Sequence, residues 1–193
     1  KCARSYIENN FKETPKDKDS LIQLVASSME YANMIVYEKS KEEKELEGMG
    51  TTLEVCLIYN NKAYIGHIGD SRVYRIRKNF MRKLTSDHSY VEKLVKEGTI
   101  TKEEAYNHPK KNMITRAVGT SSIINMDLFI ETWEKGNILF ICSDGLSNML
   151  KETEIKHVFM NTENIQDACN ILASMANNKG GLDNITIVAV KFN

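Results

Sequence analysis

Three aspartates stand at the ends of apolar runs, and their surroundings indicate metal chemistry. Asp144 follows the apolar run 138–143 and precedes a glycine. Asp183 lies in a Gly-Gly-Leu-Asp-Asn loop before the last apolar run, and Asp70 occupies a Gly-Asp-Ser-Arg turn. A carboxylate at the end of a buried strand is costly to desolvate unless it meets a cation or hydrogen-bond donors. Carboxylate oxygens beside glycines are ligands that Mg²⁺ or Mn²⁺ prefers.

Each aspartate also has a purely structural interpretation. An aspartate in a turn such as that of Asp70 usually accepts hydrogen bonds from its own backbone. Asp144 could be the N-cap of a helix that starts at Gly145, and Asp183 with Asn184 could form a plain turn before a strand. Taken one at a time, the three positions leave both interpretations open.

The other reactive side chains give weaker evidence for a catalytic role. The sequence has no His-x-His or His-Glu-x-x-His spacing, which disfavours a zinc hydrolase, and no phosphate-binding P-loop motif. His88 and His108 could donate protons, but a structural hydrogen-bonding role is favoured for both. Cys142 is not followed by an amide-rich loop ending in arginine, so a buried thiol is expected. For Arg72 and Arg116, salt bridges are favoured over phosphate contacts.

The elements that must position these residues follow from hydrophobic periodicity. A long helix is expected from a capping box at Ser20 and Gln23 into the charged run that ends at Glu47. Short β-branched and aromatic runs separated by turn residues predict antiparallel strands, over 53–59, 63–68, 72–76, 80–84, 123–132, 137–142 and 185–190. Further helices are expected over 1–11, 89–98, 101–106, 153–160 and 164–177. Such an order of strands and helices favours an α+β layered fold.

Composition limits the class of protein. With 193 residues, 41% hydrophobic and 27% charged, the chain has the size of one domain, 1–193. Its formal net charge of zero disfavours nucleic-acid binding, and no apolar run approaches the roughly 18 residues of a membrane helix. The scattered cysteines predict reduced thiols and a cytoplasmic protein. We expect a monomer, since no feature of the sequence requires a larger assembly. Because the chain opens with Lys1 inside a helical pattern, we expect part of the domain to precede it.

Taken together, the motifs resemble those of the metal-dependent protein phosphatases (PPM family, protein phosphatase 2C), and most closely the bacterial serine/threonine type. They occur in family order along most of the chain: Gly48–Thr52 (GMGTT), Gly66–Arg72 (GHIGDSR), Leu84–Ser89 (LTSDHS), Asn107–Pro109 (NHP), Ile114–Gly119 (ITRAVG), Cys142–Leu146 (CSDGL) and Gly181–Thr186 (GLDNIT). The resemblance implies a four-layer α-β-β-α sandwich of two antiparallel sheets flanked by helices.

The resemblance also implies site residues. Asp144 and Asp183 correspond to ligands of the first ion in a binuclear manganese or magnesium centre, and Asp70 with Asp144 to a weaker third-ion site. No side chain beyond a metal-activated water is implied as catalytic. The segment 89–111 corresponds to the family's flap beside the active site, where Ser89, His108 and the neighbouring Asn112 would shape substrate access.

The activity that the resemblance implies is hydrolysis of phosphoserine and phosphothreonine in proteins, with a serine/threonine kinase and its substrates as partners in bacterial signalling. The family's N-terminal motifs, a phosphate-binding arginine and an aspartate that bridges two ions, do not occur in this sequence. An inactive regulatory or interaction domain of the same fold is therefore the alternative, and what precedes Lys1 would discriminate between the two.

Overall fold

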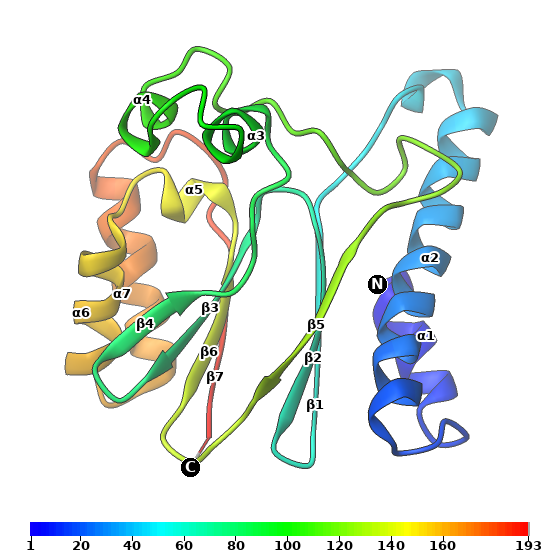
Figure 1. Cartoon of the computed structure of the whole chain (residues 1–193), viewed down its shortest axis with the longest axis horizontal. Helices are drawn as coiled ribbons and strands as arrows, with labels where there is room; N and C mark the ends of the chain where they lie inside the picture. The colour runs from blue at the N-terminus through cyan, green and yellow to red at the C-terminus, as the bar shows by residue number, and fades with distance from the viewer. Residues whose placement is uncertain (193) are drawn as a thin grey trace. The chain divides into compact units, whose positions relative to one another are not determined.

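The structure is a computed structural model and describes residues 1–192 (Figure 1). Its contacts divide the chain into two compact units, which are described separately. Unit 1 comprises residues 1–69 and 87–132, and unit 2 comprises residues 70–86 and the described residues from 133 onward. The expectation of one domain over the whole chain stays a prediction.

Unit 1 is an antiparallel sheet with a helical layer on one face (Figure 1). The strand order is β1-β2-β5, with β1 Leu53–Tyr59, β2 Lys62–Ile68 and β5 Asp127–Thr132. The helical elements of unit 1 are α1 Cys2–Asn10, α2 Lys18–Glu42, η1 Lys44–Leu46, α3 Tyr90–Lys96 and α4 Lys102–Tyr106. The core forms where Leu21, Val25 and Met29 of α2 pack with Tyr64 and Ile68 of β2, so burial of this helix face holds the unit together.

Unit 2 is a second antiparallel sheet, of order β4-β3-β6-β7, with helices against it (Figure 1). Its elements are β3 Arg72–Arg77, β4 Phe80–Lys83, β6 Ile138–Cys142, α5 Asp144–Ser147, α6 Glu152–Asn161, α7 Ile165–Asn178 and β7 Ile187–Lys191. Phe140 stacks on Tyr74 at a centroid distance of 4.9 Å and contacts Phe159 of α6 at 4.7 Å. The sheet and the helices of this unit therefore share one buried core.

Element types agree with the sequence expectations more closely than element ends do. The long helix begins at Lys18 with Asp17 as its N-cap, because that carboxylate accepts the N–H groups of Asp19 and Ser20; the capping box at Ser20 was wrong. The strand expected from residue 123 begins at Asp127, where its pairing with His67 of β2 begins. Within residues 1–192, helices of sufficient length and apolarity to cross a membrane are absent.

At Gly119 the chain passes close to α2. Its φ is +91°, and its N–H donates to the buried Oδ1 of Asn33 on α2 at 2.7 Å. A Cβ at this position would overlap the side chain of Val36. The glycine is therefore required for backbone conformation and for space at once.

We expect Gly119→Ala to lower the free energy of unfolding by about 3 kcal/mol, since alanine adds both left-handed strain and overpacking. The matched control is Gly98→Ala in the same unit, where φ is +71° but a Cβ would meet nothing within 4 Å. The control should cost only about 1 kcal/mol. Urea unfolding of both variants checks this, and equal losses would show that the contact with Val36 relaxes freely.

Candidate metal centre

The end of β6 is joined to the start of β7 by a set of hydrogen bonds centred on Ser143. Cys142 of β6 pairs with Ile187 of β7, and Ser143 continues the pairing by donating its N–H to the carbonyl of Thr186 at 3.1 Å. The Ser143 hydroxyl donates to the carbonyl of Asn184 and accepts the N–H of Thr186, both at 3.0 Å. The Ser143 side chain thus connects the loop before β7 to the turn after β6 through two hydrogen bonds.

Gly145 brings the same two segments into direct backbone contact. A Cβ at this position would overlap the carbonyl oxygen of Asn184 and lie 3.2 Å from that of Asp183. Only a residue without a side chain fits between the turn and the loop. The glycine next to Asp144 is therefore required for the close approach that brings the carboxyl groups of Asp144 and Asp183 into electrostatic contact.

The electrostatics of Asp144 show this contact. Burial raises the pKa of Asp144 above its ordinary value, and the neighbouring negative charge of Asp183 raises it further. The N–H of Gly145 and the positive charge of Arg72 offset part of the rise. Asn148 donates its side-chain amide to Oδ2 of Asp144 at 3.3 Å. The structure thus holds together two like charges that a cation would stabilise.

Asp70 lies at the same end of the unit 2 sheet. Arg72, the first residue of β3, pairs with Cys142, the last residue of β6. Asp70 and Asp144 each lie two residues beyond this antiparallel pair, so the two turns emerge from the same sheet end. The structure places all three predicted aspartates there. Within residues 1–192, however, it does not gather three or more His, Cys, Asp or Glu side chains into a ready metal-binding group.

The donor set suits a hard divalent cation. Asp144 and Asp183 offer carboxylate oxygens, and the Asp183 side chain lies in the exposed loop, where an ion can approach. The N-cap interpretation of Asp144 was wrong, because Ser143 occupies the N-cap and Asp144 is the first residue of α5. The two residues fit part of a Mg²⁺ or Mn²⁺ site.

Salt bridges were favoured for Arg72 and Arg116, and for Arg72 this stays a prediction. Arg116 places Nη1 3.1 Å from Oδ1 of Asp127, so its salt bridge is confirmed. The charge of Arg72 acts on Asp144. The sequence does not predict that Arg72 lies near this carboxylate, because the two come together only through the pairing of Arg72 with Cys142.

The residues expected in the flap lie in unit 1 and make local contacts. Ser89 is the N-cap of α3, where its Oγ accepts the N–H of Glu92 at 3.2 Å. His108 accepts the N–H of Lys110 on Nδ1 at 3.0 Å, and Asn112 is exposed. The structural hydrogen-bonding role expected for His108 is confirmed, while a role of these residues in substrate access stays a prediction.

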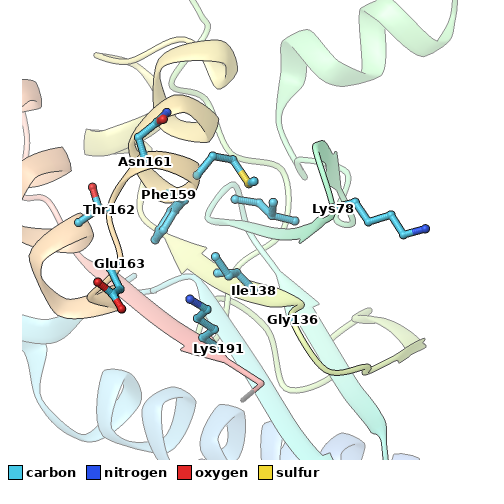
Figure 2. Close-up of a pocket in the computed structure, with 10 residues that line it drawn as sticks. Lys78, Gly136, Ile138, Phe159, Asn161, Thr162, Glu163 and Lys191 are labelled. Atoms are coloured by element: carbon cyan, nitrogen blue, oxygen red, sulfur yellow. The ribbon is translucent and has the colours of Figure 1, made fainter.

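Hollows of small-molecule size occur among the described residues of unit 2. One, of about 510 Å³, is lined by residues 181–185 and by Ala173 and Asn177 of α7, and therefore borders Asp183. The other, of about 380 Å³, has Ile138 and Phe159 in its lining; Figure 2 shows Lys191 pointing into it and Lys78 extending away. Ile138 begins β6 and Asp144 follows its end, so this second hollow is separate from the carboxylate site.

Comparison with known proteins identifies the family. The family model described as protein phosphatase 2C matches residues 1–178. The chain belongs to the protein phosphatase 2C family. Among curated relatives, the serine/threonine phosphatase stp of Listeria welshimeri is 38% identical over 160 residues, which cover 83% of this chain and 63% of the relative. Protein phosphatase PhpP of Streptococcus pneumoniae is 42% identical over 87% of this chain and 68% of the relative.

Solved structures of this protein phosphatase 2C family confirm the fold class. The S. agalactiae serine/threonine phosphatase superposes with a TM-score of 0.87 at 37% identity, covering 93% of this chain and 74% of that one. The catalytic domain of the phosphatase PstP, solved in complex with two manganese ions, has a TM-score of 0.86 at 29% identity over 100% of this chain and 80% of that one. The α+β class with two antiparallel sheets flanked by helices is therefore confirmed.

The substitution Asp144→Asn tests the raised pKa of this carboxyl group without an enzymatic assay. When folding raises the pKa of an acid, its protonated form contributes fully to stability below the unfolded-state pKa. This contribution is lost as the pH rises through the folded-state pKa, so the ionised group destabilises the fold at neutral pH. In protein freed of divalent ions, Asp144→Asn should therefore raise the melting temperature at neutral pH. The gain should vanish below the ordinary value of 3.8, where both states are protonated. Asp167→Asn, an exposed control on α7, should give no gain; a gain that persists in acid would contradict the assignment.

Ser143→Ala tests the connection between the turn and the loop. Loss of both hydroxyl hydrogen bonds should speed exchange of the Thr186 amide about tenfold and cost about 1 kcal/mol of stability. The matched control is Ser147→Ala in the same helix, since the buried Ser147 Oγ has no hydrogen-bond partner and its removal should be neutral or stabilising. Hydrogen exchange read by NMR separates the two, and an unchanged Thr186 amide would show that the Ser143 side chain is dispensable.

Proposed function

We propose that the protein containing this chain is a serine/threonine phosphoprotein phosphatase that hydrolyses phosphomonoesters with Mn²⁺ or Mg²⁺. The chain spans about three fifths of the length of the Listeria relatives it matches, so the activity of the whole protein is inferred. The observation that carries the proposal is the close approach of the segments that carry Asp144 and Asp183, whose charges interact, in a chain of the protein phosphatase 2C family.

The proposed residues have distinct tasks. Asp144 and Asp183 hold a divalent ion through their carboxylate oxygens, and Asp70 contributes to a weaker, third-ion site at the same sheet end. Bound divalent ions lower the pKa of water and neutralise phosphoryl oxygens, which is the chemistry that phosphomonoester hydrolysis requires. Ser143 and Gly145 keep the two ligand-bearing segments together.

We further propose the setting in which this activity operates. Phosphorylated proteins are the substrates, and a serine/threonine kinase and its targets are the partners. The segment 89–111 acts as a flap in which Ser89, His108 and Asn112 shape access. A monomer in the cytoplasm is sufficient for this role. Support comes from bacterial relatives named serine/threonine phosphatase stp and protein phosphatase PhpP.

The experiment compares Asp144→Asn, Asp183→Asn and the charge-matched control Asp167→Asn in the longest natural protein that contains this chain. We expect the first two to lose activity on a small aryl phosphate by a factor on the order of 100 or more, because each removes an ion ligand. Asp167→Asn should retain full activity.

A binding readout accompanies the rates. Mn²⁺ should raise the melting temperature of the unsubstituted protein and of Asp167→Asn, but not of the two ligand variants. Full turnover in both ligand variants would overturn the assignment. Mn²⁺-dependent stabilisation without hydrolysis of any phosphomonoester would instead favour the inactive regulatory domain.

A further inference from the structure

Unit 1 contains a cluster of charged and titratable side chains that the proposed chemistry does not use. The histidine cluster consists of Glu54, His67, His88, Arg116 and Asp127. His67 is fully buried, with Nδ1 3.0 Å from Oε1 of Glu54, and its ring centroid lies 4.5 Å from that of His88. The His88 side chain is 4% exposed, with Nε2 3.2 Å from Oδ2 of Asp127. Burying such groups is costly unless each has a partner.

The hydrogen bonds of His88 define its tautomer. The N–H of Gly69 donates to Nδ1 of His88 at 3.2 Å, so Nδ1 must be the unprotonated acceptor. The neutral ring then carries its proton on Nε2, which lies 3.2 Å from both Oδ2 of Asp127 and Nη1 of Arg116. Because the guanidinium has no acceptor, Nε2 donates to Asp127. Arg116 donates to the other oxygen of the same carboxylate. Burial lowers the pKa of His88 more than its bond to Asp127 raises it, which agrees with a neutral ring.

The backbone of His88 forms hydrogen bonds with two segments that are distant in the sequence. Its N–H donates to the carbonyl of Gly69 at 2.7 Å, and its carbonyl accepts the N–H of Thr115, also at 2.7 Å. The next residue pair, Ser89 and Ile114, forms an antiparallel bridge. The two ends of segment 89–114 therefore lie next to each other beside His88. Gly69, the residue before Asp70, is hydrogen-bonded to both the ring and the backbone of His88.

We propose that His88 is a positioning residue which, from one neutral imidazole, holds Gly69 through Nδ1 and the base of segment 89–114 through Nε2 and Asp127. The two nitrogens have separable tasks. The Nδ1 contact orients the turn that carries Asp70, and the Nε2 contact anchors the segment through which substrate gains access. These two consequences for activity rest on the proposed function, whereas the hydrogen-bond arrangement does not.

Two substitutions separate the nitrogens. His88→Asn places an amide oxygen near the position of Nδ1 and keeps an acceptor for Gly69, but it does not reach Asp127. His88→Gln reaches the position of Nε2 and keeps a donor to Asp127, but it removes the acceptor for Gly69. His157→Asn, on the exposed surface of α6, is the control.

Hydrogen exchange and NMR on the longest natural protein test the arrangement directly. In the unsubstituted protein, imidazole ¹⁵N shifts should show Nδ1 of His88 unprotonated and Nε2 protonated at neutral pH. The Gly69 amide should exchange about tenfold faster in His88→Gln and be unchanged in His88→Asn, as expected for loss of one hydrogen bond. Amides of Tyr90 and Thr115 should show the opposite pattern.

Kinetics test the consequence. His88→Asn should raise KM for a phosphopeptide several-fold while leaving turnover of a small aryl phosphate unchanged. His88→Gln should raise the Mn²⁺ concentration needed for half-maximal rate with both substrates. Identical behaviour of the two variants, or a protonated Nδ1 in the unsubstituted protein, would overturn the proposal. If the unsubstituted protein hydrolyses neither substrate, the proposed function fails, while the exchange and NMR results still decide the role of His88.

Discussion

The contact between Gly145 and the carbonyl of Asn184 is the constraint on which the candidate site depends. Two carboxylates of like charge do not approach each other unless the backbone forces them to do so. Here the absent side chain of Gly145 allows the turn and the loop to touch, and the hydroxyl of Ser143 fastens them. Burial of Asp144, and then the neighbouring charge of Asp183, raise the pKa of Asp144, and a bound divalent cation would stabilise the ionised form.

The two units use polar groups in different ways. In unit 2 the candidate ligands lie at a sheet end, partly open to solvent, where an ion can neutralise them. In unit 1 the charges of the histidine cluster neutralise one another, with the neutral ring of His88 between Gly69 and Asp127. The buried histidines of this network favour one conformation of the chain, because a rearrangement would leave a buried polar group without its partner.

Sequence reasoning succeeded where local chemistry decides the outcome. The short helices expected over 89–98 and 101–106 both occur, and each begins at a local N-cap, Ser89 for α3 and Thr101 for α4. It failed at the start of α2, where Asp17 accepts the N–H groups of Asp19 and Ser20 and also the hydroxyl of Ser20, so that Ser20 lies inside the helix. The outcome at this helix end is thus decided by which of two nearby side chains accepts the free N–H groups.

The sequence by itself determined the strand and helix pattern, the positions of Asp70, Asp144 and Asp183 at the ends of apolar runs, and the family motifs, because these depend on neighbours within a few residues. Only the tertiary structure decided that Asp144 meets Asp183, and that His88 meets Gly69 and Asp127. Those pairs are separated by many residues. Their closeness follows from strand register and from side chains packing across the sheets, which no local pattern encodes.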